Sequence, residues 1–189
     1  SYFCSNPHPV SQESAIIQKA KKIKAIFFDV DGVLTDGGII YDNAGLEYKR
    51  FNVKDGQIIK HLKQAGIITG VITGRSSQVV KNRCEELKID VHRHGIHNKL
   101  ETFEQLLLEQ GLEPNQVAYI GDDINDLPVL TRCGLSATPA DGHEAVRDNV
   151  DLTLETKGGD GALRELADLI LSAQGIYERI IEKLKRGDG

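Results

Sequence analysis

The chain has 189 residues, with 23 Lys plus Arg and 28 Asp plus Glu, so its formal net charge is −5. This length fits one compact domain, and the acidic balance argues against a nucleic-acid-binding protein, which usually carries a basic face. No apolar run approaches the roughly 18–20 residues that cross a bilayer, and the first residues do not resemble a secretory signal. We therefore expect a cytoplasmic protein with neither nucleic acid nor membrane as a partner.

The cysteines give no sign of a disulfide framework or a metal site. There are three, Cys4, Cys84 and Cys133, and they are scattered along the chain. None belongs to a C-x-x-C pair, so the sequence does not predict a thiolate zinc site. We expect unpaired thiols in a reducing compartment.

Residues 1–22 are predicted to form an N-terminal arm followed by a helix. Residues 1–10 carry two prolines and no periodic pattern, which is typical of a loose arm. From residue 11 to residue 22, Ile16, Ile17 and Ala20 recur at helical spacing.

From residue 23 onward, short apolar runs typical of buried strands alternate with helical patterns. Strands are predicted within 25–32, 67–73, 89–95, 117–123, 134–140 and 150–155. Helices are predicted at about 55–65, 76–87 and 98–110, from about 125, over 143–149, and over 158–186 with a break at Gly175. Residues 37–51 read as a β-hairpin whose turn is Asp42-Asn43-Ala44-Gly45.

This alternation predicts an α/β protein: a three-layer sandwich with a mainly parallel sheet and right-handed crossovers. Ligands in such sheets bind at the carboxyl ends of the strands. Three of the predicted strands end in polar residues, at positions 29–32 (DVDG), 73–75 (TGR) and 121–123 (GDD). We expect these three strand ends to meet at one edge of the sheet.

The strand ends are rich in carboxylates. Asp29 and Asp31 precede Gly32, which lets the chain turn close to a ligand, and Asp122, Asp123 and Asp126 follow a later strand. Gathering so many acids is unfavourable unless a cation offsets their charge. Oxygen ligands with room for water and phosphate favour Mg²⁺, which is the expected cofactor.

Two further residues fit a phosphate site. Thr73 follows a buried strand, where its hydroxyl can donate to a phosphate oxygen. Lys99 begins a predicted helix, a position that the positive end of the helix dipole disfavours for a cation. A neighbouring anion or acid cluster would explain why a lysine stands there.

The order D-x-D, Thr, Lys, G-D-D-x-x-D resembles that of the haloacid dehalogenase superfamily of phosphohydrolases. The resemblance implies a Rossmann-like core and a Mg²⁺-dependent phosphatase in which Asp29 is the nucleophile and Asp31 the general acid–base. It implies that Thr73 and Lys99 hold the phosphoryl oxygens, and that Asp29, Asp31 and Asp122 bind the metal. Gly32, Asp123 and Asp126 would support the site. A carboxylate nucleophile with Mg²⁺ and a lysine suits phosphoryl transfer, which mainly needs positioning and positive charge.

The spacing of the motifs leaves no room for a cap domain. Only 42 positions separate Asp31 from Thr73, and 23 separate Lys99 from Asp122. The site is therefore expected to be open, and a neighbouring subunit is the simplest candidate to cover it.

The chain is further similar to one capless family, the 3-deoxy-D-manno-octulosonate (KDO) 8-phosphate phosphatases of lipopolysaccharide synthesis. The similarity covers residues 23–175 and rests on DVDGVLTDGGIIY, FNVKDG, ITGR, NRCEEL, NKL, VAYIGDDINDLPV and GGDGALRELADLILSAQG. It implies a homo-oligomer, a tetramer built through the hairpin, and a sugar-acid phosphate as substrate. The implied substrate contacts are Asp31, Asn52, Val53, Lys54, Asp55, Gly56, Lys60, Arg75, Arg83 and Lys99.

Alternatives stay open at this stage. A sister branch acts on nine-carbon sugar-acid phosphates and carries Glu where this chain has Arg75, so Arg75 favours the eight-carbon acid. A catalytically silent regulatory subunit is a further alternative, although all the catalytic positions are present. Residues 176–189 are predicted to form a helical tail whose apolar face packs on the core or on a partner.

Overall fold

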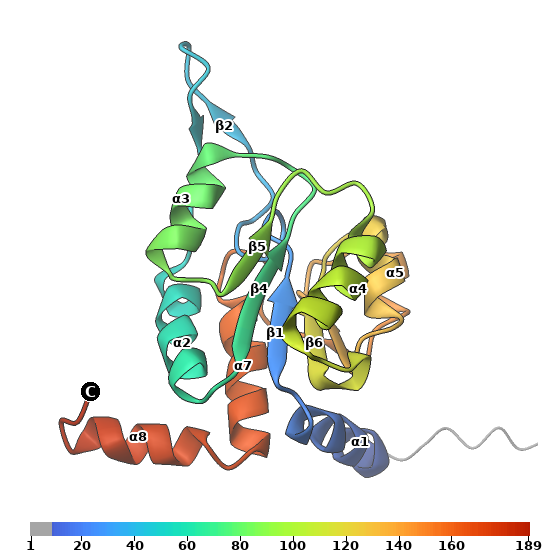
Figure 1. Cartoon of the computed structure of the whole chain (residues 1–189), viewed down its shortest axis with the longest axis vertical. Helices are drawn as coiled ribbons and strands as arrows, with labels where there is room; N and C mark the ends of the chain where they lie inside the picture. Colours follow the sequence, from blue (N-terminus) through green and yellow to red (C-terminus); the bar gives the residue numbers. More distant parts are fainter. Residues whose placement is uncertain (1–8) are drawn as a thin grey trace, which may run out of the picture.

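The computed structural model describes residues 9–189, so most of the predicted N-terminal arm lies outside the described residues. Helix α1 (Pro9–Lys21) begins the described chain and starts two residues before the predicted helix. A six-stranded parallel sheet follows, as predicted, in the order β5-β4-β1-β6-β7-β8 (Figure 1). Its strands are β1 (Ala25–Phe28), β4 (Ile68–Ile72), β5 (Val91–Arg93), β6 (Val117–Ile120), β7 (Leu135–Thr138) and β8 (Leu152–Thr153).

Helices cover both faces of the sheet and produce the predicted three-layer sandwich. On the first face lie α1, α2 (Val53–Gln64), α3 (Gln78–Glu86) and α7 (Ala162–Ala173). On the second lie α4 (Lys99–Gln110), α5 (Leu127–Leu130) and α6 (Glu144–Arg147). The side chains of the fully buried strand β1 point alternately to the two faces of the sheet. Ile26 and Phe28 pack in the core on the first face, whereas Ala25 and Phe27 pack in the core on the second face.

Capping residues explain where the helices begin and end. The Asn52 side chain accepts from the backbone N–H of Lys54, so α2 begins at Val53, two residues before the predicted start. Helix α3 begins at Gln78, later than predicted, and the Ser77 side chain at its N-cap makes no capping hydrogen bond. Gly111, in the left-handed conformation, ends α4 as expected. Short 3₁₀ helices at Pro114–Gln116 and Ile124–Asp126 precede β6 and α5 respectively.

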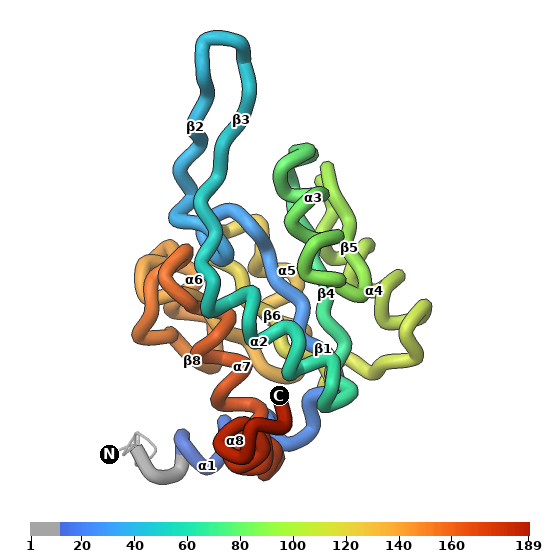
Figure 2. Tube along the Cα trace, turned by 90° about the vertical axis from the view of Figure 1, so that its left-hand side faces the viewer, coloured from blue at the N-terminus to red at the C-terminus, as the bar shows by residue number. Residues whose placement is uncertain are grey.

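The predicted hairpin projects from the body of the molecule, at the end away from α1 and α8 (Figure 2). Its strands, β2 (Ile40–Tyr41) and β3 (Glu47–Tyr48), are only two residues long, shorter than the apolar pattern suggested. Phe51 is partly buried against the core, whereas the other apolar residues of the hairpin are exposed: Ile39, Ile40, Tyr41, Leu46 and Tyr48.

The chain breaks at Gly175, as predicted, and continues as α8 (Tyr177–Lys185). The start of α8 packs on the first core through Ile176, Tyr177 and Ile180, while Leu184 near its end stays exposed. Within residues 9–189, every helix is too short or too polar to cross a lipid bilayer.

Candidate functional site

The register of the three central strands brings the predicted catalytic residues to one edge of the sheet. Phe28 pairs with Val71 of β4 and with Ile120 of β6. Asp29, Thr73 and Asp122 therefore leave their strands side by side. The backbone N–H of Asp29 donates to the carbonyl of Ile120 at 3.1 Å, and Thr73 is only 1% exposed.

Lys99 is buried between two carboxylates at this edge. Its Nζ lies 2.7 Å from Asp29 Oδ2 and 2.7 Å from Asp126 Oδ1, and the residue is 3% exposed. Burial alone would lower the pKa of Lys99, but Asp29 and Asp126 more than offset it and raise the pKa above its usual value. The acid cluster thus explains why a lysine begins α4, as the sequence suggested.

Asp126 orients the site, because its two oxygens are already engaged. Oδ1 accepts from Lys99 and from the Tyr119 hydroxyl at 2.9 Å. Oδ2 accepts from the backbone N–H groups of Asp122 and Asp123. Asp123 in turn caps the 3₁₀ helix through Ile124 N–H. Through these hydrogen bonds, Asp126 and Asp123 hold the loop that carries Asp122.

Asp29 and Asp122 are the carboxylates best suited to a metal ion. Burial, together with repulsion from Asp126, raises the pKa of Asp29 to about 6. Burial, together with repulsion from Asp29, Asp126 and Asp123, raises the pKa of Asp122 to about 7. One oxygen from each of Asp29, Asp122 and Asp126 falls within a group spanning no more than 4.8 Å. A divalent cation would relieve this repulsion, and hard oxygen donors suit Mg²⁺.

Gly32 allows the first loop to approach Asp122. A Cβ atom on Gly32 would come 1.8 Å from Asp122 Oδ2, and the residue has a φ of +82°. Any side chain there would displace the carboxylate. The loop that carries Gly158 and Gly159 packs on the same turn, because Gly159 N–H donates to the Val33 carbonyl at 3.0 Å.

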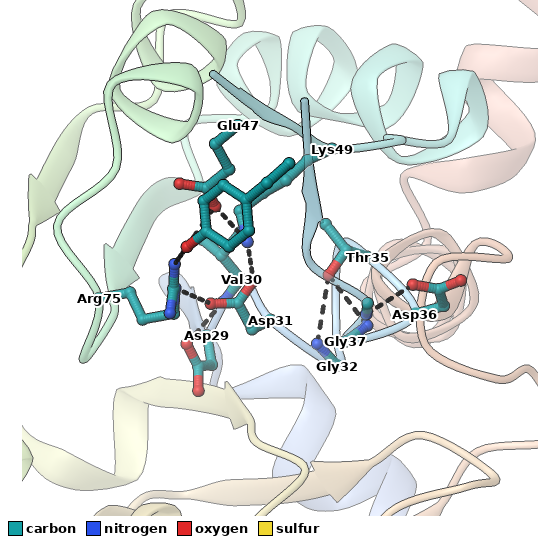
Figure 3. Close-up of polar contacts among 12 residues, drawn as sticks. Asp29, Val30, Asp31, Gly32, Thr35, Asp36, Gly37, Glu47, Lys49 and Arg75 are labelled. Carbon is teal, nitrogen blue, oxygen red and sulfur yellow. Dashed lines mark hydrogen bonds and ion pairs between the residues drawn. The ribbon is translucent and has the colours of Figure 1, made fainter. Parts of the chain in front are cut away.

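Asp31 lies apart from the metal group and faces the hairpin (Figure 3). Its carboxylate pairs with Lys49 Nζ at 2.5 Å and with Arg75 Nε at 3.8 Å. Glu47 contacts the same two cations, at 3.2 Å from Lys49 and 3.5 Å from Arg75. Arg75 also donates to the Tyr41 hydroxyl at 3.1 Å. The stem of the chain's own hairpin thus reaches the site.

Glu47, Lys49 and Tyr41 were not among the site residues predicted from the sequence. Glu47 and Lys49 stand two apart in a strand pattern, so they share a face opposite Leu46 and Tyr48. That alternation was visible in the sequence. It could not show that the polar face turns toward Asp31, because this depends on how the hairpin leaves the body.

The remaining implied substrate contacts lie on α2 and α3, where two of them have a structural role. Asn52 caps α2, and Asp55 Oδ1 accepts from the backbone N–H of Arg164 at 2.9 Å, which caps α7. Burial raises the pKa of Asp55 to about 6 despite this bond and the nearby arginines. The Asp55 carboxylate therefore joins α2 to α7.

The other contacts line a groove between the two helices. Val53, Gly56, Lys60 and Arg83 all border it, and Lys54 is exposed nearby. Arg83 lies over the Phe51 ring at 5.5 Å and pairs with Glu86 at 3.0 Å. A Cβ on Gly56 would come 2.8 Å from Arg83 Nη2, so the glycine makes room for the guanidinium.

Comparison with known proteins identifies the family of this chain. A family model of haloacid dehalogenase-like hydrolases matches residues 52–134. The chain is 43% identical over 167 residues to the 3-deoxy-D-manno-octulosonate 8-phosphate phosphatase KdsC of Escherichia coli K12, covering 88% of each protein.

Solved structures agree with the sequence comparison. The Yersinia pestis phosphatase of the same name superposes with a TM-score of 0.85 at 41% identity, covering 87% of this chain and 89% of that one. The Moraxella catarrhalis phosphatase, solved with magnesium, phosphate and KDO, gives a TM-score of 0.87 at 43% identity, covering 89% and 97%. The chain therefore belongs to the 3-deoxy-D-manno-octulosonate 8-phosphate phosphatase family of haloacid dehalogenase-like hydrolases.

Proposed function

We propose that this protein is a Mg²⁺-dependent phosphatase that hydrolyses KDO 8-phosphate to KDO and phosphate in lipopolysaccharide biosynthesis. The observation that carries the proposal is the meeting of Asp29 and Asp122, which follow the parallel strands β1 and β6, with Lys99 at the start of α4. The Moraxella relative, solved with magnesium, phosphate and KDO, supports the same ligands here.

The side chains support a two-step reaction through an aspartyl-phosphate. Asp29 attacks phosphorus, and the bond from phosphorus to the sugar oxygen breaks as Asp31 protonates that oxygen. Asp31 then accepts a proton from water, whose oxygen attacks the acyl phosphate. Phosphate leaves and the Asp29 carboxylate is restored. Lys99 and Thr73 stabilise the phosphoryl oxygens throughout.

Asp29, Asp31 and Asp122 would hold the Mg²⁺, and the Asp31 carboxylate is also paired with Lys49 and Arg75. The bound ion would supply positive charge to the phosphoryl group. Asp29 then needs only to stay ionised, and its pKa of about 6 leaves it largely ionised at neutral pH.

Replacing the nucleophile tests the function. Asp29→Asn should abolish phosphate release from KDO 8-phosphate, because a neutral amide cannot attack phosphorus, while the nearly isosteric change leaves the circular dichroism spectrum unchanged. Phosphate release is measured with Mg²⁺ and with chelator, beside the exposed control Asp148→Asn, which should match the parent. Turnover by the Asp29 variant near the parent rate would contradict the assignment, and so would failure of the parent to hydrolyse this substrate.

Removing the Asp122 charge should stabilise the metal-free protein. The folded-state pKa of about 7 exceeds the ordinary value near 3.8, so the free energy of unfolding falls as pH rises from the ordinary value to about 7 and stays at its lower level above that. Asp122→Asn should therefore melt at a higher temperature than the parent at pH about 8, with the gap closing as pH falls below the ordinary pKa of an aspartate.

The same variant tests metal binding. Mg²⁺ should raise the melting temperature of the parent but not of Asp122→Asn, because the variant lacks one anionic ligand. Both are followed by circular dichroism. Equal stabilisation of the two proteins by Mg²⁺ would show that Asp122 is not a ligand.

Arg75 is proposed to bind the carboxylate of the sugar acid. Lys99 is committed to Asp29 and Asp126, whereas Arg75 is exposed and reaches its partners at 3.1–3.8 Å. A charge-assisted contact contributes on the order of 1.5–3 kcal/mol. Since Arg75 must first leave Glu47 and Asp31, we expect the lower end of this range.

Arg75→Ala should lower kcat/KM for KDO 8-phosphate by roughly tenfold, the equivalent of about 1.4 kcal/mol. Hydrolysis of a small aryl phosphate, which has no carboxylate, should change far less. Equal losses on both substrates would mean that Arg75 serves the phosphate or the fold, and would reopen the nine-carbon alternative.

We also propose that the hairpin assembles a homotetramer that completes the open site. Five of its large apolar side chains are exposed by 42–60%, more than a lone hairpin usually leaves to water. Light scattering should give four times the chain mass, and Ile40→Glu should lower it. A monomer at micromolar concentration would refute this.

The free thiols Cys84 and Cys133 suit a reducing compartment, which supports a cytoplasmic location.

A further inference from the structure

A second group of potential metal ligands lies away from the carboxylates, between α3 and the edge strand β5. Cys84 of α3, His92 of β5 and His94 each offer a ligand atom, and these atoms lie within 4.8 Å of one another. Figure 1 shows α3 alongside β5 at this edge of the sheet. The reaction proposed above uses none of the three residues.

The fold brings these residues together although the sequence pattern gave no sign of a site. His92 pairs with Val71, a residue of the core beneath α3, so its side chain points toward that helix. His94, two residues on, points the same way. Cys84 lies on the inner face of α3 and is 2% exposed.

The hydrogen bonds of the two histidines do not engage all of their ring nitrogens. His92 Nδ1 and His94 Nε2 are 2.7 Å apart, with one ring donating to the other. His94 Nδ1 is buried and has no hydrogen-bond partner. Burial, together with His92 and Lys81, lowers the pKa of His94, so the ring is neutral and able to bind a metal at physiological pH.

We propose that Cys84, His92 and His94 form a binding site for a borderline-soft divalent cation of the zinc type. One thiolate and two imidazoles are ligands that zinc prefers, whereas Mg²⁺ prefers oxygen. A water molecule would complete the tetrahedron. The two rings must separate slightly, because nitrogens that each lie about 2.0–2.1 Å from one zinc ion are more than 2.7 Å apart.

Binding forms a bond from sulfur to the metal and releases the Cys84 proton to solvent. Burial, with a contribution from Glu85, raises the pKa of this thiol to about 11, so the free thiol is protonated at neutral pH and the cation has to displace the proton. The nearby Lys81 opposes the added positive charge and Glu85 favours it. The partly exposed His92 and His94 leave the cation an approach.

Such a site would fasten α3 to the segment that supports the catalytic loop. Ile96 N–H donates to the Thr73 carbonyl at 3.0 Å, and Gly95 N–H donates to the Arg75 carbonyl at 3.3 Å. A metal bound at His94 would therefore restrain the strand end that carries Thr73 and Arg75. The site is placed to stabilise the catalytic edge without contacting substrate.

Cobalt(II) is a suitable probe, because a cobalt–thiolate bond gives a near-ultraviolet charge-transfer band that carboxylate ligands do not. The full chain carrying Cys4→Ser and Cys133→Ser keeps Cys84 as its one thiol. Titrated with Co²⁺ in excess Mg²⁺, it should develop this band at a stoichiometry of one ion per chain. Adding Asp122→Asn should leave the band intact, which separates this site from the carboxylate cluster.

Two variants test the ligands. Cys84→Ser in the same background should show no band. His92→Gln with His94→Gln should weaken Co²⁺ binding by roughly tenfold or more, because losing a residue that merely supports a metal ligand already weakens binding by about this factor. A folded background protein without a band would overturn the proposal, and so would unchanged affinity after the histidine changes. The histidine variant keeps Cys84, so the test holds even if Cys84→Ser fails to fold.

Discussion

The burial of Lys99 between Asp29 and Asp126 is the interaction on which the site depends. The parallel strands β1 and β6 deliver carboxylates to one edge, and the mutual repulsion of these carboxylates would oppose folding if no cation lay among them. Lys99 offsets part of this charge and makes two 2.7 Å contacts in a nearly dry setting. Breaking such a buried pair leaves an unpaired charge, which typically costs about 3–5 kcal/mol.

The two aspartates of the first loop are separated by this arrangement into different roles. Asp29 points inward to Lys99 and the metal group, whereas Asp31 points toward Lys49 and Arg75. Asp29 directly follows β1, whereas Asp31 lies in the turn that comes next. The two carboxylates are thus held by separate sets of cations, Asp29 by Lys99 and Asp31 by Lys49 and Arg75.

Much of this was predictable from the sequence, because strand and helix patterns are local and parallel strands align their carboxyl ends. The apolar runs before Asp29, Thr73 and Asp122 were enough to expect one shared edge. Contacts set by tertiary packing were not predictable. Asp55 caps a helix that begins more than a hundred positions later, and the Cys84 cluster depends on the register of β5 against β4. The orientation of Glu47 and Lys49 toward Asp31 depends in the same way on the angle at which the hairpin leaves the body of the molecule.

A double-mutant cycle on Lys99→Met and Asp126→Asn tests the central claim most directly. Urea unfolding of the parent, the two single variants and the double variant is measured in chelator at neutral pH. Each single change should destabilise the protein, and the double variant should be more stable than the sum of the two losses predicts, by about 1 kcal/mol or more. Additive losses would contradict the claim, because they would mean that Lys99 and Asp126 contribute to stability independently of each other.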